Sequence, residues 1–334
     1  MSDHLAAVYD LVIFDLDGVV YLTDEPIDGA AEAIERLRTA GTAVAYATNN
    51  ASRRAADVAA ALTGMGVPAE PAEVLTSAGA AASLLARKLP AGSPVLVVGA
   101  DALRAEVRDA GLVPVEKLED NPAAVVQGYG PDVGWRILSE AALAVRAGAL
   151  WVATNTDRTL PSPRGPLPGN GSLVAVLRTA LDRDPDLVVG KPEPALFTTA
   201  AANAHAKHPL AVGDRLDTDI QGAVTAGLDS LLVLTGVSTP ADLLAATPDR
   251  RPTYVAADLA ALFHPADALR VPLDATKADG WQVTREDETA TLTGDGDPLT
   301  ALRLLCTTTW TGVPLTSLRA GSDAARALFQ DWGL

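Results

Sequence analysis

Short apolar runs alternate with amphipathic segments along the first 265 residues of the chain. The runs are apolar at almost every position, which is typical of parallel strands buried on both faces of a sheet. The segments between them place apolar residues on one side of a helix. We therefore predict an α/β fold with a doubly wound parallel sheet. The predicted strands are residues 11–14, 43–47, 94–98, 123–127, 150–153, 210–213 and 230–234.

Capping residues indicate where several of the predicted helices begin and end. The helix at residues 30–39 stops at Gly41, and Ser52 is the predicted N-cap of a helix that reaches Met65. Pro194 is well placed to open a later helix, because proline suits the first helical position. Strand and helix thus follow one another from the start of the chain, as in a doubly wound sheet.

A second, smaller α/β unit is predicted as an insertion into the first. Between about residues 77 and 185, strands are separated by helices such as 100–110 and 133–147. The stretch 155–171 is dense in proline and glycine, which indicates a structured loop. The predicted parts are 1–77, first part of the core; 78–185, inserted α/β cap; 186–265, second part of the core; and 266–334, a small α+β C-terminal segment.

The C-terminal segment is predicted to contain a hairpin at 281–293 and helices at 298–310 and 323–332. It is too short to fold alone with comfort. It also carries too much apolar surface to leave in water. We therefore expect it to pack on the core, the cap or a second subunit, and to stabilise rather than catalyse. Its large apolar residues are Trp281, Leu302, Leu304, Leu305, Trp310, Phe329 and Trp332.

The chain is acidic, with a formal net charge of −16 at pH 7 over 334 residues. Such a chain is repelled by nucleic-acid phosphates and anionic membranes, so neither is expected as a partner. Its single cysteine, Cys306, fits a reducing compartment. The N-terminal apolar run is too short for a signal peptide, and no stretch reaches transmembrane length. We expect a cytoplasmic protein, and the sequence leaves a homodimer open.

Carboxylates follow two of the predicted strands. Asp15 and Asp17 come directly after the first strand, and Asp214 and Asp219 follow the strand at 210–213. Ligand sites of open α/β sheets form at the carboxyl ends of strands, and clustered carboxylates suit Mg²⁺. The four histidines are scattered, so a zinc site is not expected. An ordinary Asp-Gly turn after a strand would also explain the first pair.

Small polar residues and one lysine are candidates for binding an anion. Thr48, Asn49 and Asn50 combine a hydroxyl, two amides and backbone N–H groups at the start of a predicted helix. Taken alone, they are better explained by simple helix capping, but they lie at the equivalent strand end one unit after Asp15 and Asp17, which favours a site. Lys191 lies between a glycine and a proline, where it could present a charge to phosphate or remain a surface lysine. Asp157, in the 155–171 loop, could reach a substrate or be solvated.

Four motifs, taken in order, resemble those of the haloacid dehalogenase superfamily phosphatases. They are Asp15-Leu16-Asp17-Gly18-Val19, Thr48-Asn49-Asn50, Lys191-Pro192 and Gly213-Asp214-Arg215-Leu216-Asp217-Thr218-Asp219-Ile220. The Thr-Asn-Asn form and the position of the cap resemble the NagD-like subfamily. The same is true of Asn155-x-Asp157-x-x-x-Pro161 with Pro168-Gly169-x-Gly171-Ser172. The resemblance covers about residues 8 to 265.

The resemblance implies a role for each motif residue. Asp15 would be the nucleophile and Asp17 the general acid and base. Mg²⁺ would be held by Asp15, the main-chain carbonyl of Asp17 and Asp214, with Asp219 as a ligand through water or an orienting group. Thr48, Asn49 and Lys191 would hold the phosphoryl oxygens. It implies no role for Asp217. The substrate would be a small phosphorylated metabolite, above all glycerol 3-phosphate, with phosphoglycolate, pyridoxal phosphate or a nucleotide monophosphate as alternatives.

Two further interpretations concern the whole chain. Residues 270–334 resemble part of a GNAT acetyltransferase, but no acetyl-CoA pyrophosphate loop is recognisable there, so acetyl transfer is not predicted. A catalytically silent scaffold that binds a phosphorylated ligand is the alternative to an enzyme. Since every position that the phosphatase motifs require is occupied, the sequence favours the enzyme.

Overall fold

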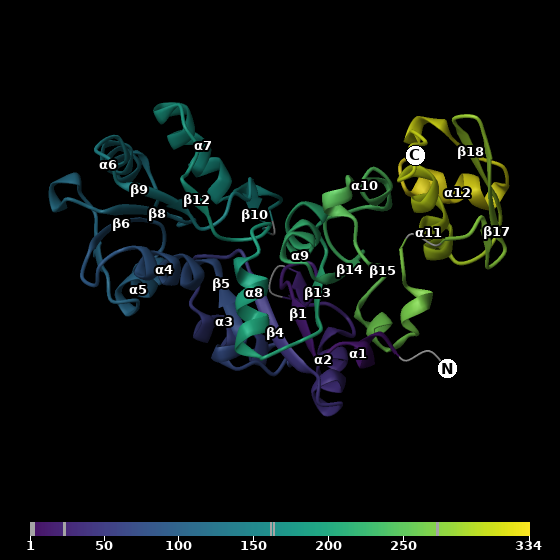
Figure 1. Ribbon diagram of the computed structural model, residues 1–334, viewed down its shortest axis with the longest axis horizontal. Helices are drawn as coiled ribbons and strands as arrows, with labels where there is room; N and C mark the ends of the chain where they lie inside the picture. The colour runs from purple at the N-terminus through teal and green to yellow at the C-terminus, as the bar shows by residue number, and fades with distance from the viewer. Residues whose placement is uncertain (1–3, 23–24, 161, 163, 272–273) are drawn as a thin grey trace. The chain divides into compact units, whose positions relative to one another are not determined.

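The computed structural model describes residues 4–22, 25–160, 162, 164–271 and 274–334 (Figure 1). The chain divides into two compact units, one made of Met1–Val44 with Ala204–Leu334 and the other of Ala45–Asn203. Strand β4 (Ala43–Thr48) begins in the first and ends in the second. The predicted division into core, cap and C-terminal segment stays a prediction.

The first unit is built on parallel strands in the order β15-β14-β13-β1. Each of the two inner strands, β13 and β14, is buried at four of its five positions, as expected for a sheet covered on both faces. The elements of this part are α1 (Leu5–Val8), β1 (Leu11–Phe14), α2 (Ala30–Thr39), β13 (Pro209–Gly213), α9 (Gln221–Ala226), β14 (Asp229–Val233), α10 (Pro240–Leu244) and β15 (Tyr254–Ala256). A two-stranded ribbon, β2 (Tyr21–Leu22) with β3 (Glu25–Pro26), follows β1.

The C-terminal segment forms a four-stranded sheet with two helices. Its elements are β16 (Lys277–Ala278), β17 (Trp281–Glu286), β18 (Thr289–Gly294), α11 (Pro298–Thr309), β19 (Leu318–Ala320) and α12 (Asp323–Asp331). The hairpin and both helices agree with the sequence analysis, and β19 adds a parallel neighbour to β18. Asp297 is the N-cap of α11, and its side chain accepts the N–H of Thr300.

A shared hydrophobic cluster attaches this segment to the rest of the first unit. Trp281, Leu302 and Leu305 are buried in one cluster with Leu216 and Ile220. Trp310 adds polar contacts, because its Nε1 donates to the carbonyl of Leu243 and its ring lies under the Arg251 guanidinium. The expectation that the segment packs against the core is confirmed.

The second unit contains five parallel strands in the order β12-β9-β8-β6-β7. Its strands are β5 (Val74–Thr76), which pairs with β4, then β6 (Pro94–Val98), β7 (Val113–Val115), β8 (Ala124–Gln127), β9 (Leu150–Ala153) and β12 (Leu187–Val188). Its helices are α3 (Ala55–Gly64), α4 (Ser77–Lys88), α5 (Asp101–Asp109), α6 (Trp135–Arg146), α7 (Asn170–Leu181) and α8 (Ala195–Asn203). A short ribbon, β10 (Thr159–Leu160) with β11 (Leu167–Pro168), lies in the loop before α7.

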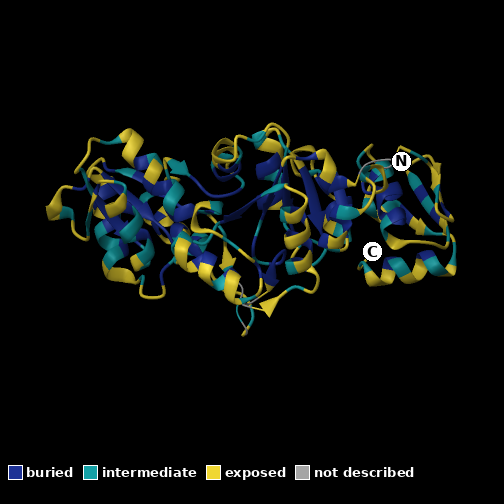
Figure 2. Ribbon diagram, turned by 90° about the horizontal axis from the view of Figure 1, so that it is seen from below, coloured by how far each residue is buried: buried dark blue, intermediate teal, exposed yellow. Residues whose placement is uncertain are grey.

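Alternate strand residues of this sheet enter two separate cores. Val95 and Val97 of β6 pack with α4 and α5, whereas Leu96 and Val98 pack with α6 and α7. The two helix pairs lie on opposite faces of the sheet in Figure 1. Figure 2 shows the buried positions gathered on strands and the exposed ones along outer helix faces. The predicted doubly wound α/β fold is confirmed.

One cap differs from the prediction. The N-cap of α3 is Arg54, whose N–H donates to Asp57, and not Ser52. Ser52 instead donates both its N–H and its hydroxyl to the side-chain oxygen of Asn50, which tightens the turn before the helix. Within the described residues, no helix has the length and apolar content needed to cross a membrane.

Candidate active site

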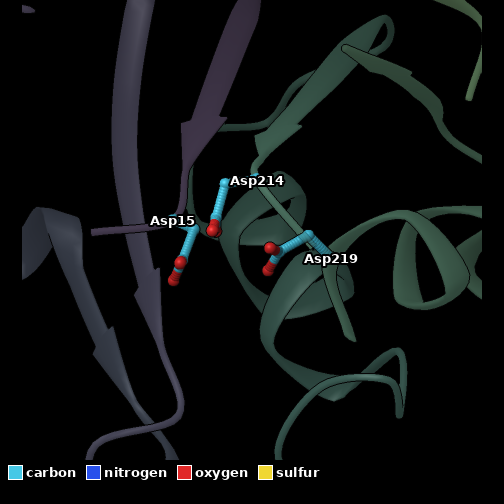
Figure 3. A group of neighbouring side chains, drawn as sticks. All are labelled: Asp15, Asp214 and Asp219. Carbon is cyan, nitrogen blue, oxygen red and sulfur yellow. The ribbon is translucent and has the colours of Figure 1, made fainter. Parts of the chain in front are cut away.

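Three carboxylates of the first unit converge at the carboxyl end of its sheet. Asp15 follows β1, Asp214 follows β13, and Asp219 lies five residues beyond Asp214 (Figure 3). One oxygen of each lies within 4.8 Å of an oxygen of each of the others. Asp214 and Asp219 are almost completely buried. Carboxylates this close repel one another unless a cation or protons compensate their charge.

This donor set fits Mg²⁺. Three carboxylate oxygens, with no histidine or cysteine in the group, match the hard oxygen ligands that Mg²⁺ takes. The residues that would hold the ion are therefore Asp15, Asp214 and Asp219. The predicted contribution of the Asp17 main-chain carbonyl stays a prediction, because the group of three consists of side-chain oxygens alone.

Backbone groups hold Asp214 in place. Its Oδ2 accepts the N–H of Val237 at 2.7 Å, and its main-chain carbonyl accepts the N–H of Ser238 at 3.0 Å. The carboxylate is also closely packed, because a Cβ atom at Gly18 or at Gly236 would overlap it. Two glycines therefore let the backbone approach the carboxylate, a close packing that only a residue without a side chain permits.

A π-helical turn, Leu216–Ile220, presents Asp219. Asp219 Oδ2 accepts the N–H of Arg215 at 3.1 Å, and a Cβ at Gly213 would overlap Asp219. Leu216 and Ile220, on the same turn, are buried in the cluster shared with the C-terminal segment. The turn is thus anchored by apolar side chains while its carboxylate faces Asp15 and Asp214 (Figure 3).

Asp217, to which the sequence analysis gives no role, forms an ion pair. The Arg215 guanidinium donates to both of its oxygens, at 3.1 and 3.0 Å. Burial alone would raise the pKa of the Asp217 carboxyl, but the bonds from Arg215 outweigh burial and lower it. The paired carboxylate is therefore a local brace for Arg215.

In the second unit, the Thr48-Asn49-Asn50 loop is bound tightly to its surroundings. The side-chain Nδ2 of Asn49 donates to Asp157 Oδ2 at 3.0 Å and to the carbonyl of Lys191 at 2.9 Å. An amide nitrogen carries two hydrogens, so both are used within the protein. If Asn49 binds phosphate, its main-chain N–H is the group left to do so.

Lys191 is almost fully buried, with 2% of its surface exposed, so it is not a surface lysine. Its Nζ donates to the carbonyl of Ala47 at 2.9 Å, which holds the ammonium next to the end of β4. A Cβ at the preceding Gly190 would overlap Asn49 Oδ1. The structure therefore brings Lys191, Asn49 and Asp157 together, as it brings Asp15, Asp214 and Asp219 together in the first unit.

The sequence analysis missed two buried residues beside this loop, Ser77 and Asn155. Both donate to the main-chain carbonyl of Asn49, each at 2.6 Å. Asn155 is part of the Asn155-x-Asp157 motif quoted above. Ser77 directly follows β5, so the sequence signal for it was a polar residue at the end of a further strand. Pro161, the last residue of that motif, lies outside the described residues.

A cavity of about 920 Å³ lies elsewhere in the second unit, at the carboxyl ends of β6 and β8. It is lined by Ser52, Arg53 and Tyr129, among other residues. Its described lining includes none of Thr48, Asn49, Asn50, Asp157 and Lys191. The cavity is therefore not the space in which these candidate residues meet.

The tight contact at Gly236 leads to a prediction. Gly236→Ala should weaken Mg²⁺ binding by about 10- to 100-fold, because the new methyl group displaces a carboxylate that would hold the ion. Isothermal titration with MgCl₂ measures the change. Gly64→Ala is the matched control, since a Cβ at Gly64 meets nothing within 4 Å. Unaltered Mg²⁺ affinity in Gly236→Ala would show that Asp214 does not need its observed position.

Three protein families match the chain, each over a different range of residues. The family of haloacid dehalogenase-like hydrolases matches residues 12–113, and a second haloacid dehalogenase-type hydrolase family matches residues 188–262. A domain like the GCN5-related N-acetyltransferases matches residues 278–334.

Individual relatives cover the chain more completely. The D-glycerol 3-phosphate phosphatase of Mycobacterium tuberculosis is 45% identical over 99% of the chain and 96% of its own length. A crystal structure of glycerol phosphate phosphatase from that organism, in complex with magnesium, has a TM-score of 0.92 and 46% identity, covering 99% of both chains. The acid sugar phosphatase of Staphylococcus aureus is 36% identical over 75% of the chain and 95% of its own length.

Proposed function

The chain belongs to the haloacid dehalogenase-like hydrolases, and within this family of enzymes we propose that it hydrolyses glycerol 3-phosphate. It is a phosphoric monoester hydrolase that uses Mg²⁺. The observation that carries the chemistry is the cluster of Asp15, Asp214 and Asp219. The choice of substrate is supported by the 45% identity, along nearly the whole chain, to a D-glycerol 3-phosphate phosphatase.

We propose that Asp15 is the nucleophile. Its carboxylate attacks phosphorus, the bond from phosphorus to the glycerol oxygen breaks, and an aspartyl-phosphate forms. Asp17 gives its proton to the departing alkoxide and then removes a proton from the water that hydrolyses the aspartyl-phosphate. Inorganic phosphate leaves, and both carboxyl groups return to their starting states. Asp15, Asp214 and the Asp17 carbonyl would hold Mg²⁺, with Asp219 as a ligand through water or an orienting group, and the ion would supply positive charge against the crowded oxygens.

The polar groups of the second unit are proposed to hold the phosphoryl oxygens. Thr48 would donate its hydroxyl, Asn49 its main-chain N–H and Lys191 its ammonium, an electrostatic clamp of the kind that phosphoryl transfer depends on. Asn50 and Asp157 remain proposed substrate contacts. A carboxylate is repelled by phosphate, so Asp157 would accept a hydrogen bond from a hydroxyl group of the glycerol and would not approach the phosphoryl group.

The predicted cap, residues 78–185, is proposed to exclude water from the reaction and to select the leaving group. We propose a cytoplasmic enzyme without nucleic-acid or membrane partners, supported by the charge of −16 and by the single cysteine, Cys306, which fits a reducing compartment. We also propose that the protein forms a homodimer, and analytical ultracentrifugation would test this.

A substrate screen tests the function. We expect kcat/KM for glycerol 3-phosphate to exceed the values for phosphoglycolate, pyridoxal phosphate, a nucleotide monophosphate and a sugar phosphate by at least about tenfold, the effect of one or two polar contacts to the correct leaving group. Assays with Mg²⁺ and with EDTA run in parallel. A higher kcat/KM for another ester would replace the substrate, and absence of turnover with every ester and divalent metal would contradict a phosphatase.

A further inference from the structure

The peptide group between Asn49 and Asn50 is fixed on both sides. Its carbonyl accepts hydrogen bonds from Ser77 Oγ and Asn155 Nδ2, each at 2.6 Å. Its N–H, on the opposite side, donates to Thr48 Oγ1 at 3.1 Å. A carbonyl oxygen has two lone pairs, and both are used here. The plane of this peptide therefore cannot turn without breaking three hydrogen bonds.

This arrangement determines where the Thr48 hydroxyl points its proton. A hydroxyl has one hydrogen and two lone pairs, and the Asn50 N–H occupies one lone pair of Thr48 Oγ1. The Thr48 proton must then point away from that N–H. Thr48 is 4% exposed, so bulk water competes little for this proton.

We propose that Asn155 is a positioning residue for phosphate binding, acting with Ser77 through the Asn49–Asn50 peptide to keep Thr48 oriented as a donor. This inference rests on the proposed function, which assigns Thr48 to a phosphoryl oxygen. It gives a task to the Asn155-x-Asp157 motif, which the proposed mechanism otherwise uses only at Asp157.

Asn155 itself is held rigidly enough for this task. It is 4% exposed, its Oδ1 accepts the N–H of Asp157 at 3.2 Å, and its main-chain carbonyl accepts Asn170 Nδ2 at 2.7 Å. The N–H of Gly171 in turn donates to the Asp157 carbonyl at 2.8 Å. The glycine-containing start of α7 thus braces the loop that carries Asn155.

Asparagine is the side chain that this position needs. It presents an acceptor to the Asp157 N–H and a donor to the Asn49 carbonyl from one short planar group. Asn155→Ser keeps an acceptor for the turn but is too short to reach the carbonyl. Asn155→Asp keeps the shape and places an oxygen against the carbonyl oxygen, which is repulsive.

The test is the affinity for inorganic phosphate in the presence of Mg²⁺, measured by titration calorimetry, together with KM and kcat for the preferred ester. We expect Asn155→Ser to raise the phosphate Kd by about five- to tenfold, the effect of one buried hydrogen bond. Asn155→Asp should raise it further. KM should rise in step with Kd, whereas kcat should fall by less.

Gln127→Ser is the matched control. Gln127 is fully buried in the same unit, and its side-chain Oε1 accepts the Nε1–H of Trp151 at 3.1 Å. The substitution should lower the melting temperature as Asn155→Ser does, while the phosphate Kd stays within about twofold. If Gln127→Ser weakened phosphate binding as strongly, general loosening of the unit would explain the effect and overturn the proposal.

A double-mutant cycle with Thr48→Val decides whether Asn155 acts through Thr48. In the Thr48→Val background, Asn155→Ser should change the phosphate Kd by less than about twofold. An equal factor in both backgrounds would overturn the inference. Failure of the proposed function is a separate result, namely a wild-type protein without turnover, and the phosphate Kd values would still decide the role of Asn155.

Discussion

Asp15→Asn should lower kcat by at least about 10⁴-fold while the protein stays folded, an effect of the size seen when a catalytic nucleophile is removed. The two side chains have nearly the same shape, but an amide cannot attack phosphorus. The measurement is the initial rate with saturating ester and Mg²⁺, with circular dichroism to confirm the fold. Since Asp15 also belongs to the carboxylate cluster, Mg²⁺ affinity should fall as well.

Asp217→Asn is the control for this substitution. It removes the same charge from the same unit, but its carboxylate is engaged by Arg215 and takes no part in the cluster. Its kcat should remain within about twofold of wild type, as for most substitutions away from the reacting groups. General acid–base catalysis alone contributes at least about 100-fold to a rate. If Asp15→Asn retained more than about a hundredth of the wild-type rate, the loss would therefore be too small for a nucleophile, and Asp15 would not have that role.

Removing the C-terminal segment should lower the melting temperature by at least about 10 °C. The cut is best made after Val271, because the N–H of Val271 still donates to Thr253 and the Leu269 carbonyl still accepts from Val255. Truncation would expose Leu216 and the rest of the cluster now covered by the segment. Each large apolar side chain that is returned to water lowers the free energy of unfolding by about 1.5–3 kcal/mol. Because the truncation exposes several of them, the total loss of stability is several times that of one residue.

Catalysis should survive this truncation. The S. aureus acid sugar phosphatase matches 75% of the chain over 95% of its own length, so a phosphatase of this kind fits into three quarters of the sequence. We expect kcat at saturating Mg²⁺ to stay within about threefold, well below the effect of losing a catalytic group. Should the truncated chain be insoluble, Leu305→Ala tests the same contact at a cost of about 2–5 kcal/mol. A truncated protein that is equally stable but inactive would place the segment in the catalytic machinery.

The parts of the fold that could be predicted are those encoded by neighbouring residues. The strand at Leu11–Phe14 and the helix at Ala30–Thr39 follow from local patterns of apolar residues and caps, and their boundaries agree with the structure. Asp15 and Asp214 were predicted together because parallel strands end at one edge of a sheet. The error at Ser52 has a local cause too, since the Asn50 side chain competed for its hydrogen-bonding groups.

What escaped prediction depends on contacts between distant residues. Asn155 and Ser77 meet the carbonyl of Asn49 from 106 and 28 positions away, and no periodicity of the sequence encodes such a meeting. The pairing of β19 with β18 likewise joins strands separated by a helix. Long-range hydrogen bonds of buried polar groups become visible only when the packing that buries them is known.

The positions of Asp214 and Asp219 depend on the space around them as well as on hydrogen bonds. Each carboxylate lies where a side chain on a nearby glycine, at Gly18, Gly213 or Gly236, would overlap it. A glycine offers no functional group, so a survey of polar side chains passes over these positions. In a mutational library they would nevertheless behave like catalytic residues, since alanine, the smallest replacement, already adds an atom where none fits. We therefore expect that even alanine at any of these three positions would displace Asp214 or Asp219.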